Sequence, residues 1–202
     1  MNNCIFTAHC MESFCDNSCP MLSETSYLLE RNDIPINSWV FTADANLIST
    51  ANNILDAASD TLLVYPVSGK LDTSRWSELV TYCAICKEWH GSQLHCTVYN
   101  LKLSKYLETV KQSWGTKSDG DGLDYIRIWI ESCNILIISN FDYVDFRDFE
   151  SQTLLNILQD RRSRNKTTIL ISPPINSLVS TKPSLFFNTL KSKLSESVRT
   201  VK

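Results

Sequence analysis

Four cysteines crowd the start of the chain, and a histidine lies among them: Cys4, His9, Cys10, Cys15 and Cys19. Thiolate and imidazole are ligands that suit zinc, and a tetrahedral site needs four such donors brought together by short loops. A segment with little apolar bulk can draw its folding energy from metal binding. We therefore predict one zinc ion, with His9 able to replace Cys4 or Cys10. An iron–sulfur cluster and four ordinary reduced cysteines are the alternatives.

The other four cysteines have apolar surroundings. Cys83 and Cys86 form a CxxC inside the helical pattern WSELVTYCAICKEW, while Cys96 and Cys133 border strand-like runs. Buried free cysteine behaves as a small hydrophobic residue, and we interpret all four in this way. A metal site at the CAIC sequence is the alternative.

A phosphate-binding turn is predicted at Ser68, Gly69 and Lys70, between an apolar run and a helical pattern. The P-loop motif GxxxxGK[ST] wraps phosphates in backbone N–H groups, its lysine reaches the β and γ oxygens, and its hydroxyl binds Mg²⁺. Here only the second glycine and the lysine are present. Val64 takes the place of the first glycine and Leu71 that of the hydroxyl. A simple turn is the alternative interpretation.

A metal-binding carboxylate is expected after the third strand, NILIISNFDYVDF. In register, Asn140 and Phe141 take the positions of the Mg²⁺ ligand and of the acidic residue beside it. Asn140 cannot supply negative charge, and Phe141 cannot polarise water. Asp142 lies two residues beyond Asn140 and can substitute only if the strand ends irregularly. Ser172 and Pro173, after the fourth strand, stand where a polar sensor would reach the γ-phosphate.

Three arginines form a basic turn before the fourth strand: Arg161, Arg162 and Arg164. Guanidinium groups are not buried without partners, and the preceding helix offers mainly Glu150 and Asp160. We therefore expect all three arginines to be exposed and available to phosphate or to an acidic protein surface. The alternative is that they solvate a helix end and favour its negative dipole.

Apolar runs alternate with helical patterns along the part of the chain that must position these residues. Strands are predicted at 61–66, 94–99, 134–139 and 167–172. Helices are predicted at 23–32, 43–59, 72–90, 101–114, 123–132, 149–162 and 183–197. Near-continuous apolar strands separated by helices indicate a parallel sheet covered on both faces. Ligands bind such sheets where the strands end.

Composition and charge limit the class of protein. The chain has 202 residues, 43% of them hydrophobic, and a net charge of -3. Its apolar runs are too short to span a bilayer and no secretory signal is visible, so we expect a soluble cytoplasmic protein without membrane contact. Residues 161–202 carry nine Lys or Arg against one Glu, whereas residues 1–60 and 119–160 are acidic. This asymmetry favours one basic surface; solvated helix faces are the alternative.

The order of these motifs resembles one family. The stretch SCNILIISNFDYVDFRDFESQTLLNILQDRRSRNKTTILISPP is similar to the Walker B-to-sensor segment of the DnaC/IstB-like AAA+ ATPases, which are helicase loaders and transposition helpers. The likeness extends back to the turn at 69–70, through LHCTVYNLKLSKYLETV, and forward to SLFFNTLKSKLSESV, so that it covers about residues 43–202. Some loaders of the family also carry a cysteine-rich zinc-binding region at the N-terminus.

The resemblance implies an α/β fold: a three-layer P-loop NTPase-like core of the AAA+/RecA type with a parallel sheet over 43–202. A small cysteine-rich leader with a short helix would occupy 1–35. The resemblance also implies ATP and Mg²⁺ as ligands and a replicative helicase or another replication or transposition protein as partner. The basic turn would contact DNA or a neighbouring subunit, and homo-oligomers are possible.

The incomplete motifs imply slow ATP hydrolysis. The Mg²⁺ hydroxyl, the metal carboxylate and the water-polarising acid are all missing from their motif positions, and one missing donor alone can cost about 10²–10³ in rate. The favoured function is therefore a loader or adaptor of a phage or mobile element with impaired hydrolysis. Two alternatives stay open: an active ATPase that uses Lys70 and Asp142, and an interaction module that binds no nucleotide.

Overall fold

The computed structural model describes residues 20–35, 38–58, 62–67, 72–88, 98–114 and 120–198. Within them the chain forms one four-stranded, all-parallel sheet with the strand order β1-β4-β3-β2. The strands are β1 (Leu62–Pro66), β2 (Val98–Lys102), β3 (Ile135–Ser139) and β4 (Thr167–Ser172). The predicted α/β class with a parallel sheet is confirmed.

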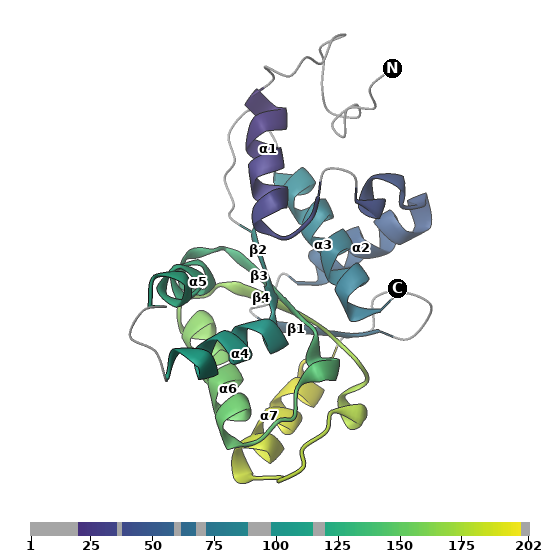
Figure 1. The fold of residues 1–202 in the computed structure, drawn as a ribbon. Helices are drawn as coiled ribbons and strands as arrows, with labels where there is room; N and C mark the ends of the chain where they lie inside the picture. Colours follow the sequence, from purple (N-terminus) through teal and green to yellow (C-terminus); the bar gives the residue numbers. More distant parts are fainter. Residues whose placement is uncertain are drawn as a thin grey trace.

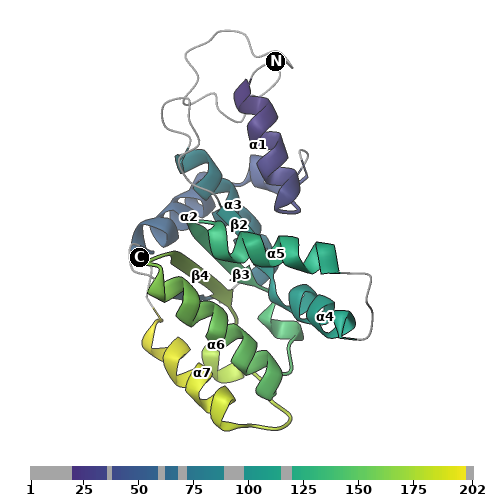
Figure 2. The ribbon, with the colours of Figure 1, turned by 90° about the vertical axis from the view of Figure 1, so that its left-hand side faces the viewer.

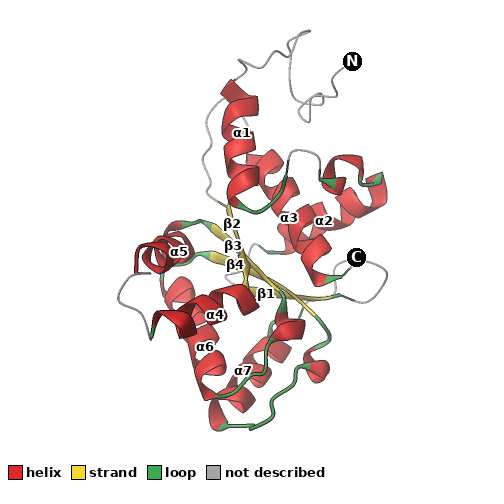
Figure 3. Ribbon diagram, in the orientation of Figure 1, coloured by secondary structure: helices red, strands yellow, loops and turns green. Residues whose placement is uncertain are grey.

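Helices connect the strands (Figures 1 and 3). The α-helices are α1 (Pro20–Arg31), α2 (Ala45–Ala57), α3 (Thr73–Glu88), α4 (Leu103–Ser113), α5 (Gly120–Ser132), α6 (Asp148–Ser163) and α7 (Leu185–Glu196). Short 3₁₀ turns are η1 (Trp39–Thr42), η2 (Phe141–Tyr143) and η3 (Ile175–Ser177). In the parts of the chain that the structure describes, no helix combines the length and the apolar character needed to cross a membrane.

The helices cover both faces of the sheet, which makes three layers (Figures 1 and 2). Alternate strand residues point to opposite faces. Ile137 and Ile169 belong to a buried cluster with α1, α2 and α3, whereas Ile138 and Leu170 belong to one with α4, α5, α6 and α7. Both faces are therefore apolar, which explains why the strand sequences lack a polar alternation. The arrangement is compatible with a P-loop-like three-layer fold.

Helix α1 packs on this core and covers part of its edge. Leu28, Leu29 and Ile34 are buried in the cluster that holds α2 and α3. The Asn32 side chain imitates a neighbouring strand: its Oδ1 accepts a hydrogen bond from the Asn100 backbone N–H at 2.6 Å, and its Nδ2 lies 3.4 Å from the carbonyl oxygen of the residue two before Asn100. The described part of the predicted 1–35 leader is thus attached to the edge strand β2.

The strand order places a topological switch between β1 and β4. The connection from β1 runs through α3 on one face, and the connection from β4 runs through α7 on the other. After α7, Val198 forms a parallel bridge with Val64 on the free side of β1. Open parallel sheets bind ligands beside such a switch, at the edge where the strands end. We name this the carboxyl edge, and the opposite one the amino edge.

The expected exposure of the basic turn is wrong for Arg161, which is only 1% exposed. The guanidinium donates five hydrogen bonds at 2.6–3.1 Å: Nε to Thr168 Oγ1, Nη1 to the carbonyls of Ile130 and Cys133, and Nη2 to those of Asn134 and Thr167. The prediction considered only carboxylate partners. Here backbone carbonyls at the end of α5 and at the start of β3 and β4 satisfy the charge.

Replacing Arg161 by methionine should lower the free energy of unfolding by about 3–5 kcal/mol, because buried carbonyls lose their donor. Urea unfolding followed by circular dichroism measures the change. The matched control is Arg162→Met at the exposed neighbour, with an expected change within about 0.5 kcal/mol. Equal effects of the two variants would contradict the anchoring role of Arg161.

Candidate functional site

The carboxyl edge brings together the segments that follow β1, β3 and β4. Ser68, Gly69 and Lys70 of the predicted phosphate-binding turn lie outside the described residues. Asp72 is the first described residue after this turn, and its Oδ1 accepts a hydrogen bond from the Arg75 N–H at 2.8 Å. Asp72 therefore caps α3, and the helix begins at Thr73, three residues after Lys70.

The end of β3 is irregular. Asn140 adopts the left-handed conformation, with φ of 62° and ψ of 42°, and the 3₁₀ turn η2 follows it. Asparagine tolerates this conformation better than most residues. The turn carries Asp142 back toward α3, where its Oδ2 accepts a hydrogen bond from Thr73 Oγ1 at 3.1 Å. The irregularity that the sequence required for Asp142 to replace Asn140 is present.

Thr73 is the site residue that sequence reasoning missed. It is the first residue of α3 and is 6% exposed, whereas Asp142 is exposed. The motif reserves the hydroxyl for the residue after the lysine, here Leu71, but the structure brings the hydroxyl of Thr73 to the carboxylate. Its signal in the sequence is its place directly after the capping Asp72.

A hydroxyl and a carboxylate side by side are hard oxygen ligands of the kind that Mg²⁺ prefers. In P-loop proteins these two groups, one at the start of the helix and one after a neighbouring strand, hold the Mg²⁺ that bridges the phosphates. The N-terminus of the 16-residue α3 adds partial positive charge beside them. The pair therefore fits a magnesium–phosphate complex by its chemistry.

Two serines end the central strands nearby. Ser139, the last residue of β3, is completely buried, and its Oγ has no hydrogen-bond partner. Ser172, the last residue of β4, is also buried, and its Oγ donates to the Pro173 carbonyl at 2.9 Å. The hydroxyl predicted as a sensor is thus engaged with its own backbone, and the unsatisfied oxygen of this edge belongs to Ser139.

The basic turn lies at the amino edge, away from Thr73 and Asp142. Arg162 and Arg164 are exposed there, and Arg164 pairs with Asp160 at 3.2 Å. Burial, and secondarily the charge of Arg162, lower the pKa of Lys193 at the end of α7. The structure therefore separates the cations from the candidate phosphate site and gathers Arg162 and Lys193 beside each other.

The predicted zinc ligands Cys4, His9, Cys10, Cys15 and Cys19 lie outside the described residues, as does Cys96. Of the remaining cysteines, Cys83 and Cys133 are buried and Cys86 is half-buried. Burial raises the pKa of Cys83 to about 12 and that of Cys86 to about 11, so both thiols stay protonated at neutral pH. In the described ranges no three His, Cys, Asp or Glu side chains converge as a metal site.

No family model matches this chain, and the search of curated proteins finds no match either.

A double-mutant cycle should detect the contact between Thr73 and Asp142. Thr73→Val and Asp142→Ala, alone and combined, should give a coupling of about 0.5–1.5 kcal/mol in the free energy of unfolding, the range of a typical intramolecular hydrogen bond. Additive effects would show that the two groups do not interact in solution.

Proposed function

We propose that this chain is a P-loop-like nucleotide-binding adaptor of the AAA+ type, related in role to helicase loaders of phages or mobile elements, with impaired ATP hydrolysis. The observation that carries the proposal is the hydrogen bond between Thr73 and Asp142. It joins the helix that follows the glycine–lysine turn to the segment that follows a central strand, at the carboxyl edge.

Each residue has a distinct part in the proposed site. Lys70 and the backbone of Ser68 and Gly69 contact the phosphates, while Thr73 and Asp142 hold Mg²⁺, which neutralises phosphate charge. Hydrolysis also needs a group that orients or polarises the attacking water. Phe141 stands next to the strand end where such an acid would be expected, and its ring is buried. This favours binding over turnover.

Titration with a fluorescent ATP analogue tests this site. Binding in Mg²⁺ should be saturable, and Asp142→Asn should weaken it by about tenfold, a change of about 1.4 kcal/mol. In EDTA the same substitution should have little effect, because the carboxylate acts through the metal. The control is Asp148→Asn, an exposed carboxylate at the start of α6.

The outcomes also separate the alternative functions. Phosphate release slower than about 1 per second would agree with impaired hydrolysis. Release at an ordinary enzymatic rate that Asp142→Asn abolishes would instead support an active ATPase. Absence of any nucleotide binding would leave an interaction module and would overturn the proposal.

The rest of the proposal concerns partners. A zinc-bound leader would contact a replicative helicase or another replication or transposition protein in the cytoplasm, and the chain would form a homo-oligomer. The support for DNA contact is the amino edge, where Arg162 and Arg164 are exposed and the charge of Arg162 acts on Lys193. Guanidinium groups bind phosphate in a planar, bidentate manner.

DNA affinity should fall steeply with salt if this edge binds the duplex. The variant Arg162→Ala/Lys193→Ala should reduce the slope of log K against log salt by about two, roughly one per lost phosphate contact. The control Lys102→Ala removes a cation on β2 that pairs with Asp33. An unchanged slope, together with loss of a protein partner in a pull-down, would assign the edge to protein contact.

A further inference from the structure

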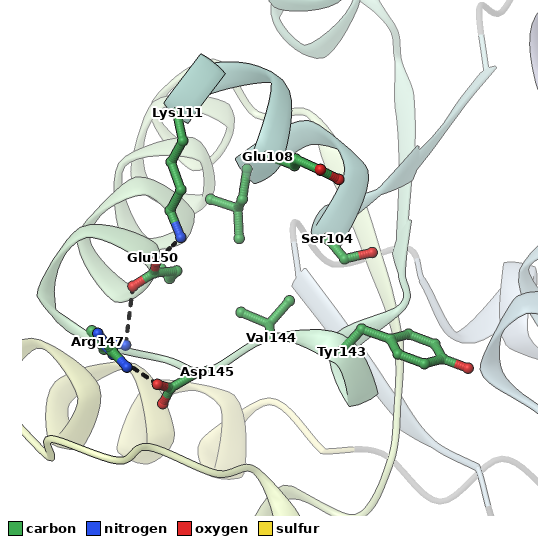
Figure 4. A pocket seen from close by; sticks show the side chains of 9 residues that line it. Ser104, Glu108, Lys111, Tyr143, Val144, Asp145, Arg147 and Glu150 are labelled. Atoms are coloured by element: carbon green, nitrogen blue, oxygen red, sulfur yellow. Dashed lines mark hydrogen bonds and ion pairs between the residues drawn. The ribbon is translucent and has the colours of Figure 1, made fainter. Parts of the chain in front are cut away.

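An open hollow of about 580 Å³ lies between α4, the segment after η2 and the start of α6 (Figure 4). Its size is within the range of ligand-binding pockets. The helices that form it cover the opposite face of the sheet from α3. It is therefore separate from the Thr73–Asp142 pair, although Tyr143 and Val144 on its wall directly follow Asp142 in the chain.

The hollow combines an apolar floor with charged walls. Leu107 of α4 and Val144 are 3% and 8% exposed and belong to the buried core. Around them, Ser104, Glu108 and Lys111 come from α4, whereas Glu150 comes from the start of α6 (Figure 4). Such a surface matches an amphipathic group, with an aliphatic stem for the floor and a polar head for the wall.

The charged side chains on the wall decide whether the polar head of such a ligand should be a cation or an anion. Lys111 Nζ lies 2.5 Å from Glu150 Oε1, and Arg147 Nε lies 2.7 Å from Asp145 Oδ2. Both cations are thus neutralised by carboxylates. The exposed Glu108 has no Lys, Arg or His within ion-pair distance among the described residues; its recorded contact is the neutral Gln112 amide, 3.4 Å away.

Among the described residues, an anionic ligand would meet only cations that already have a carboxylate partner, beside the unpaired charge of Glu108. The Glu150 side chain is only 6% exposed, so removing Lys111 from it would leave a buried carboxylate without a partner, which is strongly unfavourable. A purely apolar ligand would desolvate Glu108 without compensation. A cation with an aliphatic stem meets neither obstacle.

We propose that this hollow docks a lysine or arginine side chain of a partner protein. The methylene stem lies on Leu107 and Val144, and the charged head pairs with Glu108. The surface therefore selects a basic peptide segment. This proposal does not rest on nucleotide binding and survives if the Thr73–Asp142 site proves inactive.

Titration of the full-length ¹⁵N-labelled protein with short peptides tests the proposal. The probe is acetyl-Gly-Arg-Gly-amide, compared with the same peptide carrying norleucine or glutamate in place of arginine. The arginine peptide should give saturable shifts at the amides of Leu107, Glu108 and Val144, with at least about fivefold higher affinity than the other two. Equal binding of the norleucine or glutamate peptide, or no saturation by the arginine peptide, overturns the proposal.

Variants identify the side chain that recognises the positive charge of the peptide. Glu108→Gln should weaken binding of the arginine peptide by about fivefold, the effect of about 1 kcal/mol. Glu131→Gln, at an exposed carboxylate of α5, should leave the affinity unchanged. Glu108→Arg should reverse the preference in favour of the glutamate peptide. Unaltered arginine binding in Glu108→Gln, or retained preference in Glu108→Arg, overturns the assignment, and backbone spectra establish that each variant is folded.

Discussion

The buried guanidinium of Arg161 holds together the amino ends of the two central strands. Taking an ion out of water costs several kcal/mol unless its hydrogen bonds are replaced, and here five donors meet oxygen acceptors at the end of α5 and the start of β3 and β4. From this point β3 and β4 pair in parallel, from Ile135 beside Thr167 to Ile138 beside Leu170. The place where each strand ends, and with it the position of Asp142, follows from the register that is fixed at the opposite edge.

The layers of the fold could be predicted from the sequence because both faces of the sheet are covered. A strand between two helical layers must be apolar at successive positions, and β4 was predicted at 167–172 with the bounds that it has. The start of α5 was harder to predict, since the helix was expected to begin at residue 123 whereas it begins at Gly120. Local propensity favours a loop there, and tertiary context can override such a weak preference.

The candidate site was less predictable than the fold, for two physical reasons. A motif counts residues along the chain, whereas contacts depend on where a helix starts and how a strand ends. Thr73 was therefore overlooked. The position of Asp142 beside it depends on the left-handed conformation of Asn140, which the motif does not specify. The burial of Arg161 had no signal in side-chain types, because its acceptors are almost all backbone carbonyls, which every sequence possesses. The zinc site predicted at the leader stays a prediction.

The segment from Phe141 to Arg147 runs from the candidate phosphate site to the hollow beside α4. At one end Asp142 accepts from Thr73, and at the other Asp145 accepts two hydrogen bonds from Thr181, at 2.7 Å from its N–H and 2.6 Å from its hydroxyl. Just outside these two aspartates, the buried rings of Phe141 and Phe146 stack with their centroids 6.1 Å apart.

The hydrogen bonds from Thr181, together with the contact to Arg147, lower the pKa of Asp145 to about 2. Because the pKa in the folded state lies below the ordinary value of an aspartate, this anchor stabilises the fold above about pH 4 and is lost as the pH falls toward 2. At neutral pH Asp145 is therefore ionised, and this anchor is intact. Val144, on the floor of the hollow, lies in the chain between Asp142, which contacts Thr73, and Asp145, which Thr181 holds.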